Sequence, residues 1–282
     1  MLPKVENSSG LIGCTDSNVF GAKVPITGCA GDQQAALLGQ GAINPGESKC
    51  TYGTGNFLLM NTGSSIVESE NLVTTIAWSI DDNPVYALEG SIFTTGAAVQ
   101  WLREGLGIIS TSEETDELAS SIPDNGGVYM VPAFTGLGAP HWDQYARGII
   151  TGLTRGTTRA HIVRAMLESI AYQTMDLVES MENDSGFTLK ALRVDGGVSR
   201  NDFLMQFQAD VLGIPVIRSA MIEATARGAA ILAGVGVGLW DTLKEVISVD
   251  YERNLIKPNM SECIRQRLKA GWRLALGKAL FR

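Results

Sequence analysis

Tyr52-Gly53-Thr54-Gly55-Asn56-Phe57 lies inside a strand-like segment, residues 48–62, which two further strand-like segments follow at 73–80 and 85–92. The connections are short, so we expect the three strands to run antiparallel to their neighbours. Two glycines around Thr54 let the backbone bend sharply, and exposed N–H groups with the threonine hydroxyl form a neutral cradle for phosphate oxygens. A glycine bulge within an ordinary strand is the alternative interpretation.

The residues on either side of these strands predict the rest of the fold. The first 23 residues are polar and irregular, and an extended run at 24–27 and a helix at 33–41 follow them. Beyond the strands, helices are expected at 95–106, 112–121, 157–183, 201–212 and 223–236, with short strands at 128–132, 191–194 and 214–217. This order predicts an α/β fold with a mixed sheet flanked by helices. It fits one lobe of the actin-like ATPase or ribonuclease H-like architecture, in which two lobes clamp a nucleotide.

A second glycine-containing corner, Asp195-Gly196-Gly197, follows the expected strand at 191–194. Ligands of α/β sheets collect at the carboxyl ends of strands, and a helix that begins near Asn201 offers unpaired N–H groups to an anion. The pattern favours a nucleotide or phosphate site. Glycines that serve only the geometry of a strand–turn–helix connection are the alternative.

Asp32 precedes the helix expected at 33–41, and two roles are open to it. As an N-cap, its carboxylate accepts N–H bonds from the first helical turn, and the local sequence favours this role. As a general base, it accepts the proton of an attacking hydroxyl while Gln33 orients the same substrate. One carboxylate serves both roles only if one of its oxygens stays free to face the substrate.

The composition argues against several classes of protein. The 282 residues carry a net charge of −8, whereas nucleic-acid-binding proteins have basic surfaces. No apolar run reaches 18 residues and no signal peptide is recognisable, so we expect a cytoplasmic protein without a membrane partner. The four cysteines and two histidines are scattered, which argues against a protein-bound metal site, a disulfide framework and a Ser-His-Asp triad.

The two common nucleotide-binding motifs are not supported. Glu47 stands where a P-loop requires lysine, and a carboxylate cannot replace that cation beside phosphates. Gly53 and Gly55 lack the third glycine of a dinucleotide-binding turn, because Leu58 stands at the position of that glycine.

Near the end of the chain, residues 261–281 form a basic amphipathic helix pattern. We expect this helix to dock on its own domain, with a membrane-surface helix as the alternative.

Four segments resemble the glycerol kinases of the FGGY carbohydrate kinase family, in the family's order and spacing. Residues 28–37 resemble the segment with the substrate aspartate, and residues 50–63 resemble the phosphate hairpin. Residues 131–148 are similar to a signature loop of the family, and residues 192–208 complete the match. Within the family, the Asp-Gln-Gln triplet at 32–34 and Phe57 favour glycerol over pentulose and hexulose substrates.

The resemblance implies ATP-dependent phosphorylation of glycerol to glycerol 3-phosphate, with ATP and Mg²⁺ as cofactors. Asp32 would be the catalytic base, Gln33 would hydrogen-bond glycerol, and Phe57 would pack against its carbons. The residues that would bind ATP are Thr54, at the phosphates, and Gly96, Gln100, Gly197 and Asn201.

Arg227 departs from the family, which usually has an apolar residue at this position. We expect this change to alter packing on the nucleotide side or a subunit contact.

By the same resemblance, residues 1–39 are a remnant of an N-terminal substrate lobe, and residues 40–282 are the C-terminal nucleotide-binding lobe. The rest of the N-terminal lobe, which helps to hold glycerol, is missing, so we expect negligible kinase activity from this chain alone. The expected partners are glycerol, ATP or ADP, that lobe, and further copies in a homo-oligomer. The alternatives are another polyol or sugar kinase of the family and a non-catalytic nucleotide-binding module.

Overall fold

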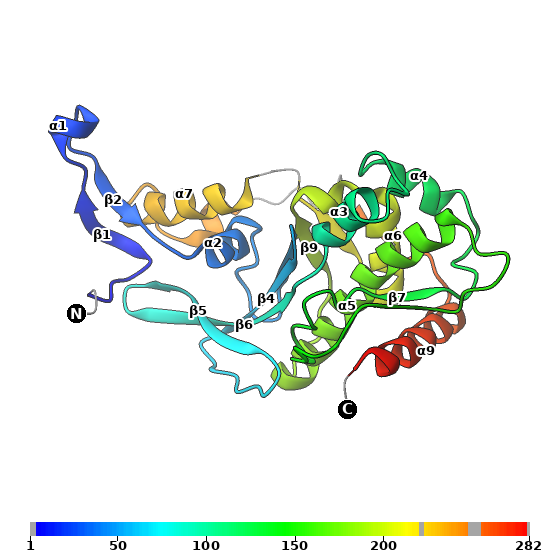
Figure 1. Cartoon of the computed structure of the whole chain (residues 1–282). Helices are drawn as coiled ribbons and strands as arrows, with labels where there is room; N and C mark the ends of the chain where they lie inside the picture. Colours follow the sequence, from blue (N-terminus) through cyan, green and yellow to red (C-terminus); the bar gives the residue numbers. More distant parts are fainter. Residues whose placement is uncertain (1–3, 220–222, 248–254, 281–282) are drawn as a thin grey trace.

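The computed structural model describes residues 4–219, 223–247 and 255–280. A nine-stranded sheet runs through this part of the chain (Figure 1). From one edge to the other, the strands are β11 (Leu255–Ile256), β10 (Val216–Arg218), β9 (Leu192–Asp195), β3 (Ser48–Tyr52), β4 (Asn56–Gly63), β6 (Asn83–Ile92), β5 (Val73–Ile80), β1 (Ser9–Cys14) and β2 (Pro25–Gly28). β3 pairs parallel with β9 and antiparallel with β4, so the sheet is mixed, as predicted.

Helices cover both faces of the sheet, because side chains along each strand alternate between two hydrophobic cores. The larger core lies under α5 (Arg159–Ser185), α6 (Asp202–Leu212) and α9 (Glu262–Ala279) and includes Leu58 of β4. The smaller core lies under α2 (Asp32–Gly39) and α7 (Ala224–Gly236) and includes the next residue, Leu59. The remaining helical segments are α1 (Ser17–Phe20), α3 (Gly96–Glu104), α4 (Glu114–Ser120), the 3₁₀ turn η1 (Gly197–Arg200) and α8 (Leu243–Val246).

The segment expected as one strand at 48–62 is a hairpin of β3 and β4, so there are four strands where three were predicted. The predicted antiparallel pairing is confirmed, because β3 pairs with β4, β4 with β6 and β6 with β5 in antiparallel fashion. The N–H of Gly53 donates a 2.9 Å hydrogen bond to the carbonyl of Gly55 within the turn. A side chain at Gly55 would overlap the carbonyl oxygen of Ile92 in β6. The glycines therefore form a tight turn against a neighbouring strand, and they do not form a bulge.

Residues 9–14, expected to be irregular, form the strand β1. It pairs antiparallel with β2 and, through Ser9 and Ile80, parallel with β5. The Oγ of Ser9 also donates a 2.8 Å hydrogen bond to the carbonyl of Leu232 in α7. Beyond these contacts, β1, α1 and β2 project from the rest of the molecule (Figure 1).

A second strand that we did not expect, β8 (Ile149–Thr151), pairs with β7 (Tyr129–Val131) in a separate small sheet.

Helices α2 and α7 cross in close contact. A Cβ atom at Gly39 would overlap the carbonyl of Ala224, and one at Gly228 would overlap the carbonyl of Ala35. The Nη1 of Arg227 donates a 2.9 Å hydrogen bond to the carbonyl of Gly39. Arg227 therefore binds the last carbonyl of α2 and adds a polar contact to the helix crossing. The domain boundary expected after residue 39 falls at the end of α2 and stays a prediction.

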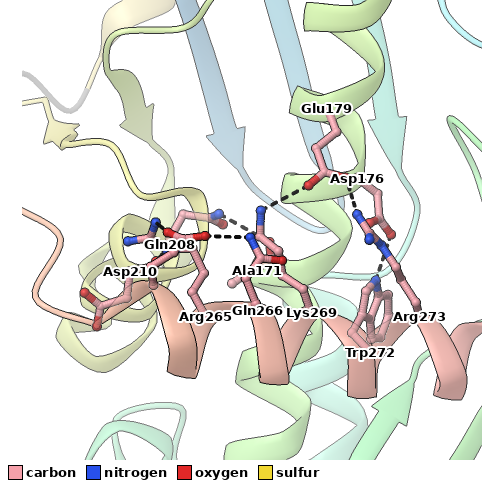
Figure 2. A network of polar contacts seen from close by, with 11 residues as sticks. Ala171, Asp176, Glu179, Gln208, Asp210, Arg265, Gln266, Lys269, Trp272 and Arg273 are labelled. Atoms are coloured by element: carbon pink, nitrogen blue, oxygen red, sulfur yellow. Dashed lines mark hydrogen bonds and ion pairs between the residues drawn. The ribbon is translucent and has the colours of Figure 1, made fainter.

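The C-terminal helix α9 docks on the domain, as its amphipathic pattern predicts. Figure 2 shows its polar contacts with α5. The Nε1 of the fully buried Trp272 donates to Asp176 at 2.8 Å, and Lys269 and Arg273 bind the two carboxylate oxygens of Glu179 at 3.1 and 3.2 Å. Within the described ranges, none of the helices combines the length and the apolar character that crossing a membrane requires.

Candidate active site at the carboxyl edge of the sheet

A cavity of about 600 Å³ opens where β3 ends and where α3 and η1 begin. The five residues that the resemblance assigns to ATP all line it, namely Thr54, Gly96, Gln100, Gly197 and Asn201. They come from the β3–β4 turn, from α3 and from the corner after β9. Three segments that are distant in the sequence therefore share one cavity, while their binding of ATP stays a prediction.

The β3–β4 turn forms one wall of the cavity, and backbone hydrogen bonds hold it against α3. The N–H groups of Thr95 and Gly96 donate to the carbonyls of Thr54 and Gly53, each at 3.0 Å. The side chain of Thr54 is exposed. The wall is thus a backbone structure fixed by hydrogen bonds, and Thr54 lines the cavity from it.

The corner after β9 forms another part of the cavity wall. Gly196 has a φ of 87°, in the left-handed region that favours glycine, and a side chain there would collide with the carbonyl of Tyr52. A Cβ atom at Gly197, by contrast, would meet no protein atom within 4 Å. Gly196 therefore permits the close approach of β9 to β3, and Gly197 leaves the cavity open.

The chain's own side chains already occupy the N-terminus of α6, so the expectation that its N–H groups are free for an anion is wrong. Asn201 caps the helix with its side chain, and Asp116 of α4 accepts hydrogen bonds from the N–H groups of Asp202 and Phe203 at 2.6 and 3.2 Å. The Nδ2 of Asn201 also donates to Thr115 at 3.0 Å. Sequence reasoning predicted α4 only as a polar helix and missed this contact, because the partners lie 86 residues apart.

Asp32 is the first residue of α2, and Gly31 is the N-cap, so the N-cap role that the local sequence favours for Asp32 is wrong. The Oδ1 of Asp32 accepts the N–H of Gln33 at 2.8 Å, and its Oδ2 lies 3.5 Å from Nε2 of Gln33. The Asp32 side chain is exposed, and Phe57 is 38% exposed. The structure thus leaves the carboxylate accessible to a substrate, and its role as a base stays a prediction.

Lys49 in β3 contacts Gln33 from within the protein, and sequence reasoning missed it. Its side chain is fully buried. The Nζ donates hydrogen bonds to Oε1 of Gln33 and, at 3.0 Å, to Oγ1 of Thr51. Burial lowers the pKa of Lys49 to about 8, and nearby carboxylates, above all that of Asp195, oppose this shift. A lysine inside an otherwise buried strand, between Ser48 and Cys50, was the available signal.

The strand register places three residues near the carboxyl end of β3 on one face of the sheet, while Asp32, Gln33 and Phe57 do not line the cavity. Thr51 in β3 lies opposite Asp195 in β9 and opposite Phe57 in β4. Register partners on neighbouring strands point to the same face, so these three residues form a row at the carboxyl end of β3. Asp195 is only 7% exposed, and its buried Oδ1 has no hydrogen-bond partner in the described part of the chain. Such an oxygen marks a place for a bound ligand, water or ion.

This fold and this arrangement of residues agree with one known family. Residues 48–237 match the C-terminal domain of the FGGY family of carbohydrate kinases. The match covers more than half of the chain, and the chain belongs to this family.

Two relatives that are similar to this chain over nearly its whole length are glycerol kinases. The chain is 59% identical to glycerol kinase 2 of Thermotoga maritima and 55% identical to glycerol kinase 2 of Sulfolobus acidocaldarius. These alignments cover 99% of this chain but 57% and 56% of the relatives, so the chain spans a little over half of their length.

Solved structures show the same relationship. Glycerol kinase of Plasmodium falciparum with ADP superposes with a TM-score of 0.91 at 39% identity, over 99% of this chain and 56% of that chain. Xylulose kinase of Rhodospirillum rubrum, at 24% identity and a TM-score of 0.84, covers 98% of this chain and 57% of its own. The second likeness shows the shared fold alone.

Proposed function

We propose that this chain forms the nucleotide-binding part, and one wall of the substrate site, of an ATP-dependent glycerol kinase that produces glycerol 3-phosphate. The observation that carries the proposal is that strand β3 connects the segment of Asp32 and Gln33 with the cavity. Lys49 holds Gln33, next to Asp32, and the same strand leads directly into the cavity at Thr54. Relatives named glycerol kinases, at 55% and 59% identity, support glycerol as the substrate.

In the proposed complex, ATP occupies the cavity between the β3–β4 turn and the corner after β9. The hydroxyl of Thr54 contacts the phosphates, while Gly96, Gln100 and Gly197 contact the rest of the nucleotide. The side chain of Asn201 is already used for capping α6 and for binding Thr115. We therefore expect Asn201 to contribute mainly by fixing the shape of the corner.

The proposed chemistry is an in-line transfer of the γ-phosphoryl group to a terminal hydroxyl of glycerol. Asp32 accepts the hydroxyl proton as the oxygen bonds to phosphorus and the bond to ADP breaks. The Oδ1 of Asp32 is engaged by the N–H of Gln33, so Oδ2 is the oxygen that faces the substrate. Gln33 hydrogen-bonds the same substrate, and Phe57 packs against its carbons.

The residues present fit a Mg²⁺ ion. The buried, unpartnered Oδ1 of Asp195 is a hard oxygen donor, which Mg²⁺ prefers together with phosphate oxygens and water. When bound with ATP, the ion supplies charge neutralisation at the phosphates. Asp195 is the residue that would hold it.

Nucleotide binding is tested on the purified chain by calorimetric titration with ADP. We expect measurable binding and a loss of about tenfold in affinity for Thr54→Ala, the worth of one hydrogen bond to a charged group. Thr188→Ala, at an exposed threonine outside the cavity, is the matched control and should bind ADP like the wild type. An absence of binding at millimolar ADP would contradict the nucleotide site.

We further propose that these 282 residues alone have negligible kinase activity. The described site supplies one wall, and phosphoryl transfer requires both reactants to be held in line. The test is an assay for glycerol 3-phosphate with the purified chain, ATP, Mg²⁺ and glycerol. Ready formation of the product would overturn this part of the proposal.

The reaction is tested in a chimera that joins this chain to the preceding part of the Thermotoga maritima relative. We expect the chimera to phosphorylate glycerol, and Asp32→Asn to lower kcat by at least about 100-fold, as loss of a general base does. Phosphorylation of xylulose or gluconate in place of glycerol would favour another sugar kinase of the family. A folded chimera that binds ADP and phosphorylates none of them would favour a non-catalytic module.

Two further expectations belong to the proposal. Assembly into a homo-oligomer is checked by light scattering of the purified chimera, where a monomer mass would contradict it. A cytoplasmic location is checked by fractionation of cells that express the protein.

A further inference from the structure

The side-chain amide of Gln33 has different partners at its two ends. Its Oε1 accepts a hydrogen bond from Nζ of Lys49, and its Nε2 lies 3.5 Å from Oδ2 of Asp32. An ammonium group has three donors and no acceptor, so only the oxygen end of the amide is able to face Lys49. The N–H₂ end must then face Asp32 and the substrate side. Lys49 thereby selects one of the two orientations of this amide.

The position of Lys49 is itself fixed. Its side chain is fully buried and also donates to Oγ1 of Thr51 at 3.0 Å. Its register partners are Arg193 in β9 and Leu59 in β4, and Leu59 belongs to the core beneath α2 and α7. A buried lysine lowers the stability of the folded protein unless its charge is paired, so packing alone does not explain why a lysine stands at position 49.

We propose that Lys49 is a positioning residue, which holds Gln33 so that the amide donates an N–H bond to the substrate hydroxyl while Asp32 receives the proton of that hydroxyl. Gln33 then fixes the oxygen that attacks, and Asp32 removes its proton. The inference deepens the proposed function, and it rests on that function for the identity of the reaction. Lys49 does not touch the substrate and acts through Gln33.

The first test uses the purified chain and does not depend on kinase activity. The two Nε2–H resonances of Gln33 are assigned by NMR from their disappearance in Gln33→Leu. We expect Lys49→Met to shift and broaden these resonances while ADP affinity stays within about twofold of wild type, because Lys49 does not line the cavity. Lys269→Met, at a largely buried lysine paired with Glu179 in α5, is the matched control and should leave them unchanged. Unchanged Gln33 resonances in Lys49→Met would overturn the proposal.

A second variant covers the case in which Lys49→Met does not fold. Gln33 lies at the partly exposed start of α2, so Gln33→Leu is expected to fold. In the wild type, the Lys49 ammonium resonance should be protected from exchange with water by its hydrogen bonds. We expect Gln33→Leu to shift this resonance and speed its exchange. If the Lys49 resonance is identical in the wild type and in Gln33→Leu, the proposal that Lys49 holds Gln33 is wrong.

The kinetic test uses the chimera. We expect Lys49→Met to lower kcat by about 10- to 100-fold, because a misplaced attacking oxygen slows transfer, while KM for ATP stays within about twofold. A change in KM for ATP with kcat unchanged would overturn the positioning role. An inactive wild-type chimera would count against the proposed function, and the NMR result on the chain would still decide whether Lys49 orients Gln33.

Discussion

The backbone N–H of Gly96 donates a 3.0 Å hydrogen bond to the carbonyl oxygen of Gly53, and this bond ties the start of α3 to the β3–β4 turn. A second bond of 3.0 Å, from Thr95 to Thr54, runs beside it. The cavity wall is therefore set by backbone contacts and not by side-chain rotamers. Small changes at the glycines should test the site directly.

Gly96→Ala and Gly197→Ala are expected to differ in their effects. A Cβ atom at Gly96 would lie 2.6 Å from the carbonyl oxygen of Gly53, so the turn must shift, at a cost of about 1–3 kcal/mol in the free energy of unfolding. A Cβ atom at Gly197 meets only the open cavity, so stability should be unchanged while ADP affinity falls. Urea unfolding and ADP titration measure both quantities. Wild-type ADP affinity in Gly197→Ala would argue against the nucleotide site.

Gly228→Ala should destabilise the protein strongly. The added methyl would overlap the carbonyl of Ala35 and push α7 away from α2, so we expect a loss of more than about 2 kcal/mol in urea unfolding. The control is Gly277→Ala, in α9, where the methyl meets no atom within 4 Å. There the gain in helix propensity should stabilise by about 0.5–1 kcal/mol. Equal effects at the two positions would contradict the close crossing.

Trp272→Phe should show the worth of the polar contact that holds α9. The change removes the donor to Asp176, whose side chain is 10% exposed, and leaves a buried carboxylate short of a partner. We expect a loss of about 1–3 kcal/mol in the free energy of unfolding. Trp142→Phe removes a comparable 2.7 Å bond to Asn71 at a half-exposed tryptophan and should cost less. A larger loss of unfolding free energy for Trp142→Phe than for Trp272→Phe would contradict a stabilising role of the bond between Trp272 and Asp176.

Lys49 should make stability depend on pH in the alkaline range. Its pKa is about 8 in the folded protein and near 10.5 when exposed, so the unfolded chain binds more protons between these values. The contribution of Lys49 to stability therefore rises as pH increases from 8 towards 10.5. Between about pH 7 and about pH 9.5, the difference in unfolding free energy between wild type and Lys49→Met should move by about 2 kcal/mol in favour of wild type. A constant difference would show that the pKa of Lys49 is not lowered.

Much of the fold could be predicted from the sequence because its signals are local. The apolar period of residues 157–183 predicted a helix that the structure places at Arg159–Ser185. The glycine pairs marked the two sharp turns, since few other residues allow such close backbone approach. The motifs around Asp32, Thr54 and Gly197 also led to the correct family, and Thr54 and Gly197 line one cavity.

The sequence by itself determined the α/β class, the positions of most helices and strands, and the family, because periodicity, turn residues and motifs are properties of short segments. Only the tertiary structure decided that β1 is a strand, that Asp116 closes the N-terminus of α6, and that Lys49 contacts Gln33. Each of these depends on a hydrogen-bond partner or a buried environment that another part of the chain supplies. A buried donor or acceptor is stable only when such a partner is present, and no local pattern specifies which one it will be.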